Sequence, residues 1–479
     1  MKPRFAFLLL LLALAALWSS ASAQEAAPKS VEGIWQGALN VSGMTLRLVV
    51  RIHKQADGAL AGTMDSVDQG ANNIPLDQVT FKDNALRLEL KSIQGVYEGK
   101  LNSARTEFTG TWQQAGNTWP LNLARTEKAP EVRRPQEPQK PYPYVEEQVT
   151  FPNKAAEVTL AGTLTRPQTG GPFPAVVLIA GSGPNSRDEN VMGHKVFLVL
   201  ADYLTRHGIA VLRYDKRGIG ASTGSYIKAT TADFAADALS AVAYLKQRKE
   251  IASDKIGLIG HSEGGVIAPI VASQSQDVKF IVLMAGTGLT GERILYLQAA
   301  LIAQAEGAPP KEIARQRALQ EQMFAVVKQE KDPAVAEKKL EALEVRAIAQ
   351  LPPAEKKTAQ SQLQQAQAGT KTLLTPWFRY FLTYDPKTAL RKVHCPALVL
   401  NGSKDLQVPP KENLPAIQAA LQEAGDKDVT VKELNGLNHL FQTCTTGSPL
   451  EYSRIEETMS PVALQTISDW ILAHTGATN

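Results

Sequence analysis

Two patterns of apolar and polar residues divide this chain of 479 residues. Between residues 32 and 125, apolar residues alternate with polar ones, as in Thr45–Ile52 and Ala85–Leu90, which indicates half-buried strands. Turn signals such as Asp57-Gly58 separate the runs. About eight short strands at close spacing predict a small antiparallel β barrel or sandwich over residues 24–126.

Two strands that carry a tryptophan lie near the ends of this region. Gly33–Gly37 and Gly110–Gln113 have related sequences around Trp35 and Trp112, and they can lie side by side in a closed meander. Core packing is the simplest role for both rings, since aromatic side chains supply much of the apolar area of a core. The alternative is that they line a ligand-binding barrel.

Residues 127–144 separate this region from the rest of the chain. They hold five prolines, which fix φ and lack the N–H donor of a strand ladder, so we expect a stiff, extended linker. At residues 145–479, runs that are apolar on both faces alternate with helical segments. This pattern predicts an α/β domain with a mostly parallel sheet and helices on both faces. The expected strands include Ala175–Ala180, Ile209–Tyr214, Lys255–Gly260, Phe280–Met284 and Ala397–Leu400.

A helical insertion interrupts the strands at about residues 287–385. The stretch is rich in Ala, Gln, Glu and Lys, and its apolar residues share helical faces, which argues against disorder. Leu319 and Met323 lie on one such face, and Asp332-Pro333 supplies an N-cap and a first-turn proline for the next helix. The insertion is therefore interpreted as a cap on the α/β domain.

The first 23 residues have the features of a cleavable signal peptide. Lys2 and Arg4 precede an apolar run, Phe5–Trp18, and Ala21-Ser22-Ala23 offers the small residues of a cleavage site. The run is shorter than the roughly 20 residues that span a bilayer. We expect a periplasmic or secreted protein, cut near Ala23–Gln24 and without a membrane span afterwards. An uncleaved signal anchor is the alternative.

A candidate nucleophile, Ser262, lies in the sequence Gly260–Gly265. This Gly-x-Ser-x-Gly pattern follows an expected strand and opens a helix, which is the strand–turn–helix context of a nucleophile elbow. Glycines suit Gly260 and Gly264 because side chains would collide in so sharp a turn. A serine hydroxyl also needs a general base to become a nucleophile at neutral pH.

His439 and Asp405 are the candidate partners of Ser262. Of the seven histidines, His439 alone is expected in a loop at the carboxyl end of a strand, where α/β sheets build their sites. Asp405 follows the expected strand Ala397–Leu400, and the order Ser, Asp, His is the order of this fold. Asp385 is the competing carboxylate, but it precedes that strand.

Two backbone N–H groups are expected to stabilise an oxyanion. One belongs to Glu263, the residue after the nucleophile. The other comes from Ala180–Pro184, whose glycines let the backbone approach a substrate. Ser182 is the preferred donor in this loop and Gly183 is the second choice. A phosphate-binding role is weak for the loop, because no Gly-Lys-Ser/Thr follows it.

Together these residues resemble the α/β-hydrolase superfamily over about residues 145–479. Asp215–Ser222 is similar to a D-x-R-G-x-G-x-S loop of its esterase and dienelactone-hydrolase-like branches, in which Asp215 and Arg217 are structural. With the signal peptide, the β domain and the cap, the chain looks like exported two-domain bacterial carboxylesterases. The resemblance implies a serine hydrolase that cleaves short-chain carboxylic esters through an acyl-enzyme on Ser262, with no cofactor and no metal.

Two other functions stay open at this point. A serine peptidase of the prolyl-oligopeptidase type shares the triad, but about 100 residues of β structure are too few for its propeller. The second is an exported ligand-binding protein with a vestigial hydrolase domain. The expected partner is a small-molecule ester. No linear motif encodes the acyl or alcohol group of the substrate, or the oligomeric state.

Composition and the cysteine count narrow the class of protein. The 51 basic and 47 acidic residues leave a net charge of +4, which gives no argument for nucleic-acid binding. Cys395 and Cys444 are too few for a disulfide-stapled scaffold. An oxidising compartment permits a bridge between them. They are expected at opposite ends of a strand of roughly 20 Å, so two separate thiols are predicted.

Overall fold

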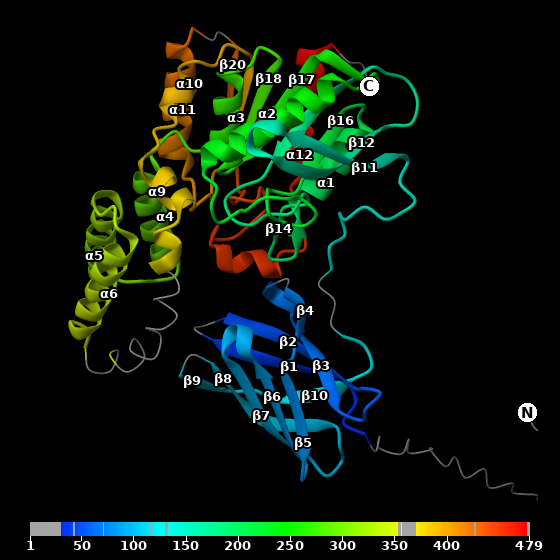
Figure 1. Cartoon of the computed structure of the whole chain (residues 1–479), viewed down its shortest axis with the longest axis vertical. Coiled ribbons are helices and arrows are strands. Elements are labelled where there is room, and N and C mark those ends of the chain that lie inside the picture. The colour runs from blue at the N-terminus through cyan, green and yellow to red at the C-terminus, as the bar shows by residue number, and fades with distance from the viewer. Residues whose placement is uncertain are drawn as a thin grey trace, which may run out of the picture.

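The computed structural model describes residues 30–41, 44–69, 71–114, 116–129, 133–352, 356, 370–425 and 428–476. These residues form an N-terminal β domain, blue and cyan in Figure 1, and a larger α/β domain above it in that view. The predicted signal peptide at residues 1–23 lies outside the described residues.

The N-terminal domain is an antiparallel sheet whose short strands alternate between buried and exposed residues. Its strands are β1 (Gly33–Val41), β2 (Met44–Lys54), β3 (Leu60–Ser66), β4 (Ala71–Pro75), β5 (Gln78–Lys82), β6 (Ala85–Leu90), β7 (Gly95–Leu101), β8 (Glu107–Gln114), β9 (Asn117–Pro120) and β10 (Leu123–Thr126). The order in the sheet is β4-β3-β2-β1-β10-β8-β7-β6-β5, with β9 paired to β8. The predicted antiparallel β domain is therefore confirmed.

The two tryptophans of this domain fill its core. Trp35 is 0% exposed and Trp112 is 2% exposed, and the ring centroids of Trp35 and Phe108 lie 4.5 Å apart. Core packing is thus the observed role of both rings. The expectation that their strands lie side by side is wrong, because β10 pairs with both β1 and β8 and lies between them. The run Leu123–Thr126 is too short to show a clear alternation in the sequence.

The α/β domain is built on a sheet in the order β11-β12-β16-β13-β17-β18-β19-β20. Its strands are β11 (Tyr144–Asn153), β12 (Val158–Pro167), β13 (Phe173–Ile179), β16 (Ala210–Tyr214), β17 (Ile251–His261), β18 (Phe280–Met284), β19 (Ala397–Gly402) and β20 (Val429–Leu434). From β16 to β20 neighbouring strands are parallel, whereas β11 and β12 form an antiparallel edge. The mostly parallel sheet was predicted correctly.

Helices cover both faces of this sheet. Val176 and Leu178 of β13 pack in the cluster that holds α1 (Val196–Arg206) and α12 (Pro461–Thr475). Ala175, Val177 and Ile179 pack on the other face, with α2 (Thr231–Lys246), α3 (Gly264–Ala272) and α11 (Pro410–Glu423). Successive strand residues point to opposite faces, so a strand buried on both faces is apolar throughout. This explains the unbroken apolar runs of the sequence.

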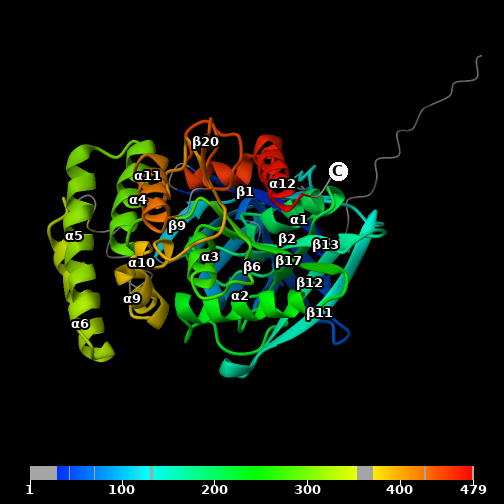
Figure 2. The same ribbon diagram turned by 90° about the horizontal axis from the view of Figure 1, so that it is seen from above.

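The cap lies between β18 and β19. It comprises α4 (Gly291–Ala305), α5 (Pro310–Gln329), α6 (Pro333–Ala349) and α9 (Pro376–Thr383), whereas Ala389 and Leu390 of the following α10 (Lys387–Leu390) pack in the core of the α/β domain. In both views α5 and α6 lie outermost, and α4 lies between them and the α/β sheet (Figures 1 and 2). Phe324, Leu340 and Leu382 are buried in a small core of the cap. Asp332 caps α6 as predicted, since its side chain accepts the N–H groups of Ala334 and Val335.

The linker is bound to the α/β domain and is not a free spacer. The Arg134 guanidinium donates hydrogen bonds to the carbonyl groups of Met192, Gly193 and Ile455. The Gln136 amide donates to the Met459 carbonyl at 2.6 Å. Its oxygen accepts the N–H groups of residues 458 and 459. The sequence predicted a stiff, extended linker, whereas the structure has a turn in which the Glu137 N–H donates to the Arg134 carbonyl group, and the side-chain contacts tie this segment to the α/β domain.

Two further expectations concern the cysteines and the membrane. Cys395 and Cys444 do not form a disulfide with each other, which confirms the predicted separate thiols. The Cys444 thiol donates to the carbonyl group of Gly436 at 3.4 Å. Among the helices that the structure describes, none has the length and hydropathy of a membrane span.

Candidate active site

Ser262 lies on a strained turn at the carboxyl end of β17. Its φ is 53°, a left-handed conformation that costs free energy for a residue with a side chain. Its N–H donates to the carbonyl group of Met284 at the end of β18, at 2.9 Å. A Cβ atom at Gly264 would collide with the carbonyl oxygen of Ile179, and one at Gly260 with that of Gly264. The glycines of the elbow are therefore required by close backbone approach.

His439 and Asp405 are brought together as the sequence predicted. His439 Nδ1 lies 2.8 Å from Asp405 Oδ2, and the two residues are 4% and 2% exposed. Asp405 Oδ1 accepts the N–H groups of Gln407 and Val408, at 2.8 Å each. With Oδ1 held by the backbone, Oδ2 remains for the imidazole, which leaves His439 Nε2 to act as a base. The competing Asp385 is exposed and accepts the N–H of Lys387 instead.

The loop that begins at Gly181 touches the nucleophile. A Cβ atom at Gly181 would lie 3.2 Å from the Cβ atom of Ser262, so only a glycine backbone comes this close without displacement. The carbonyl oxygen of Gly181 accepts Lys216 Nζ at 2.6 Å and Asn185 Nδ2 at 2.8 Å. In a trans peptide the following N–H points the opposite way. The N–H of Ser182 is therefore directed away from Lys216.

The Glu263 side chain joins the elbow to the cap. Glu263 Oε2 lies 3.2 Å from Lys216 Nζ, and both side chains are at most 5% exposed. Oε1 accepts the Thr231 hydroxyl at 2.7 Å and the Trp377 indole N–H, from cap helix α9, at 2.6 Å. The sequence assigned a role only to the Glu263 backbone. No local pattern indicated that Lys216 and Trp377 would meet its carboxylate.

The charged residues Asp215 and Arg217 of the Asp215–Ser222 loop have partners within the protein. Asp215 binds Arg187 through side chain and backbone, and its pKa is lowered because these hydrogen bonds outweigh burial. Arg217 forms a two-pronged pair with Asp237, at 2.7 Å on each prong. Both pairs hold loops in the domain.

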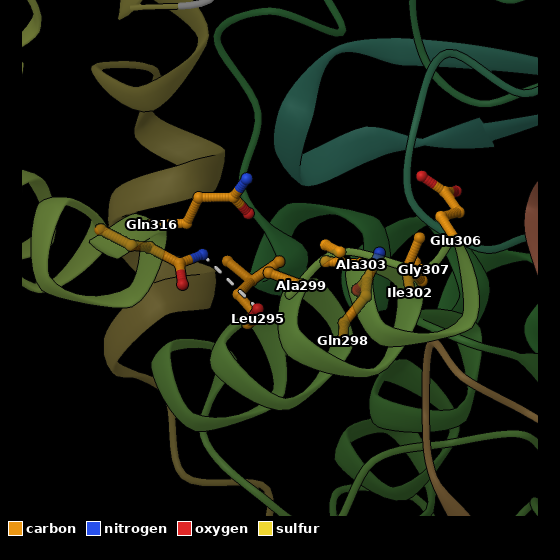
Figure 3. A pocket seen from close by; sticks show the side chains of 10 residues that line it. Leu295, Gln298, Ala299, Ile302, Ala303, Glu306, Gly307 and Gln316 are labelled. Carbon is orange, nitrogen blue, oxygen red and sulfur yellow. Dashed lines mark hydrogen bonds between the residues drawn. The ribbon is translucent and has the colours of Figure 1, made fainter. Parts of the chain in front are cut away.

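The cap contains a groove of about 550 Å³ between α4 and α5 (Figure 3). Leu295, Ala299 and Ile302 line it from α4, and Gln316 and Gln320 line it from α5. Gln320 donates to the carbonyl group of Leu295 at 3.4 Å, which links α5 to α4. The lining residues do not include Ser262, Asp405 or His439.

Comparison with known families decides the class of this protein. The sequence profile of the family described as serine aminopeptidase, S33, matches residues 194–443, which is more than half of the chain. The chain belongs to this S33 family of hydrolases. The S33 match contains the elbow, Asp405 and His439, and it confirms the predicted α/β-hydrolase fold.

A curated relative and two solved structures are similar to this S33 chain. Esterase EstD of Thermotoga maritima is 29% identical over 303 residues, which is 62% of this chain and 61% of EstD. The α/β hydrolase GrgF of Penicillium sp. sh18 aligns with a TM-score of 0.43 at 17% identity, over 69% of this chain and 99% of its own. An esterase of Pyrococcus furiosus aligns with a TM-score of 0.43 at 14% identity, over 73% of this chain and 98% of its own.

Proposed function

We propose that this S33 protein is a carboxylesterase that cleaves short-chain esters through an acyl-enzyme on Ser262. The observation that carries the proposal is the buried His439–Asp405 hydrogen bond of 2.8 Å, in the same domain as a strained serine elbow. The name of its relative, EstD, also supports an esterase.

The proposed mechanism has two half-reactions, and in each of them His439 accepts a proton and then donates it. Ser262 Oγ attacks the ester carbonyl carbon while His439 Nε2 accepts its proton, and Asp405 stabilises the imidazolium that forms. The N–H groups of Ser182 and Glu263 receive the oxyanion. His439 then protonates the departing alcohol, the C–O bond breaks, and the acyl group stays on Ser262. In the second half, His439 takes a proton from a water molecule, which attacks the acyl carbon. The bond to Ser262 Oγ then breaks, His439 returns the proton to Oγ, and the carboxylic acid leaves.

Peptide substrates are the competing class, since the family description names an aminopeptidase. An aminopeptidase needs a carboxylate that receives the α-ammonium group of its substrate. The buried carboxylates beside the elbow are engaged by the protein itself, Glu263 by Lys216 and Glu189 by His261. A prolyl-oligopeptidase propeller is also excluded for the N-terminal domain, because residues 33–126 form the antiparallel sheet described above.

The test compares Ser262→Ala with Ser240→Ala, a matched change at a partly exposed serine on α2. The wild type and Ser240→Ala are expected to hydrolyse p-nitrophenyl esters, fastest for short acyl chains, and to be labelled by a fluorophosphonate. Ser262→Ala should lose both properties and keep its circular dichroism spectrum. Labelling without ester turnover, but with cleavage of aminoacyl anilides, would favour a peptidase. No labelling at all would favour the ligand-binding protein.

We also propose that the protein is exported to the periplasm or secreted. The support is the sequence Lys2–Ala23, with its basic start, short apolar run and small residues before Gln24. The mature protein recovered from cells should begin near Gln24. An N-terminus that keeps the apolar run would instead support an uncleaved anchor.

A further inference from the structure

Glu189 and His261, the residue directly before the nucleophile, form a buried acid–base pair. Glu189 lies in the loop between β13 and β14 (Asn190–Val191), and His261 is the last residue of β17. Their side chains are 1% and 3% exposed, and His261 Nδ1 lies 3.0 Å from Glu189 Oε1. Burying ionisable groups costs free energy, so two such groups next to Ser262 need a structural reason.

Each member of the pair also binds a loop of the candidate site. Glu189 Oε1 accepts the N–H of Gly181 at 2.6 Å. Gly181 belongs to Ala180–Pro184, the loop expected to supply an oxyanion donor and called the oxyanion loop below. His261 Nε2 lies 3.0 Å from the carbonyl oxygen of His439. Three hydrogen bonds therefore run from the oxyanion loop through the nucleophile strand to the loop that carries the base.

The partner of Nε2 determines the position of one His261 proton, and the Glu189 side chain favours a second proton on Nδ1. A carbonyl oxygen can only accept, so Nε2 must carry a proton to bind His439. Glu189 Oε1 already accepts from Gly181, and as a carboxylate oxygen it accepts from Nδ1 as well. A ring protonated on both nitrogens is an imidazolium, and its charge compensates a carboxylate that is 1% exposed.

The surroundings of His261 favour the charged ring. Burial acts to lower the pKa of His261, but Glu189, the His439 carbonyl and Asp405 outweigh it and raise the pKa above its ordinary value. The titratable groups that face the ring are Glu189, Asp405 and His439, whose ring centroid lies 4.9 Å from that of His261. Two of these three groups are carboxylates that stabilise a positive charge.

We propose that Glu189 and His261 are positioning residues, a carboxylate–imidazolium pair that holds the oxyanion loop and the His439 loop around Ser262. This role rests on the proposed esterase function, because it assumes that both loops take part in the chemistry. Loss of the Nδ1 proton at alkaline pH would leave a ring lone pair facing a carboxylate oxygen. The contact then becomes repulsive and Gly181 loses its fixed acceptor, so activity should fall on the alkaline side.

Glu189→Gln tests the role in catalysis. The amide has nearly the same shape, but it lacks the charge, and it presents either its oxygen to Gly181 or its NH₂ group to His261. We expect kcat at pH 7.5 to fall about tenfold or more while KM changes less than about threefold, because an oxyanion donor is displaced. The alkaline limb of the pH–rate profile should also move to lower pH.

A matched control is Glu147→Gln, which removes a carboxylate from β11 that pairs with Arg248 at a partly exposed site. Its kcat and pH profile should equal those of the wild type. If Glu189→Gln folds and keeps both the wild-type kcat and the wild-type alkaline limb, the positioning role is wrong.

Histidine-selective ¹⁵N NMR of the whole chain detects the pair without any turnover. One histidine should keep protons on both ring nitrogens at pH 7.5, in the wild type and in Ser262→Ala, and lose one in Glu189→Gln. A wild-type spectrum in which every histidine has only one ring proton at pH 7.5 overturns the proposal, even if the Gln variant does not fold. Failure of the esterase proposal appears separately, as hydrolysis that survives Ser262→Ala.

Discussion

His194 should make the α/β domain sensitive to acid. The residue is 0% exposed, its Nε2 lies 2.7 Å from the Tyr452 carbonyl oxygen, and its Nδ1 lies 3.2 Å from the Thr458 hydroxyl. Nε2 donates and Nδ1 accepts in the neutral ring, so the folded site suits the uncharged form. Burial lowers the pKa of His194 from 6.5 to about 4. The positive charge of Arg134 also lowers this pKa, whereas the hydrogen bond to the Tyr452 carbonyl group raises it.

The sign of the effect follows from proton binding. Between pH 6.5 and about 4 the unfolded chain binds a proton at this histidine and the folded chain does not. The free energy of unfolding therefore decreases as pH falls through this window and is unaffected above it. At about 1.4 kcal/mol per pH unit, the full window corresponds to about 3 kcal/mol, of which about 2 kcal/mol is lost by pH 5.

The assay is urea unfolding at pH 7.5 and pH 5, followed by circular dichroism at 222 nm. The described α-helices begin at Val196, so this signal reports the α/β domain. The wild type should lose about 2 kcal/mol more than His194→Gln between the two pH values. His394→Gln, at an exposed histidine, should behave as the wild type. Equal losses in the wild type and His194→Gln would refute the reasoning, because carboxylates titrate alike in both.

Three other substitutions probe the carboxylate that orients His439, a buried ion pair and the contact between the elbow and the cap. Asp405→Asn should lower kcat by about 10³–10⁴ with little change in KM, since His439 loses its orienting acceptor; a loss below about tenfold would contradict this. Arg217→Met leaves the buried Asp237 carboxylate unpaired and should cost about 3–5 kcal/mol in urea unfolding, whereas a cost under about 1 kcal/mol would show that the pair is dispensable. Trp377→Phe keeps an aromatic ring and loses the indole N–H, so kcat/KM for esters should fall about tenfold. An unchanged kcat/KM would mean that the cap does not need this bond.

The strands and the candidate triad could be predicted because their signals are local. A strand buried on both faces must be apolar at every position, so β13 and β18 are recognisable from a few residues each. Ser262 has glycines fixed at neighbouring positions, and Asp405 and His439 each follow a strand. Their order along the chain, Ser, Asp and His, is the order of this fold, so the three residues could be assigned to one site without any knowledge of side-chain contacts.

The contacts around that triad were not predictable in the same way. Lys216 and Glu263 are 47 positions apart, and Trp377 lies 114 positions after Glu263. Most charged residues in loops are exposed to solvent, and a linear sequence does not reveal which of them the fold will bury. Lys216 and Glu263 are two that it buries. His261 illustrates the limit. It adjoins Ser262 in the sequence, but nothing local indicated that its ring would bind the backbone of the base, His439.

The bound linker changes where the hydrolase can be cut from the rest of the chain. A shortened protein that begins at Val145, after the predicted linker, would lose Arg134 and Gln136. Met459 would lose both of its bonds to the Gln136 side chain, and the carbonyl of Ile455 would lose its guanidinium partner. The working N-terminal boundary for isolating the catalytic unit therefore lies before Arg133. Any attempt to measure what the β domain contributes should therefore keep linker residues 133–144 attached to the α/β domain.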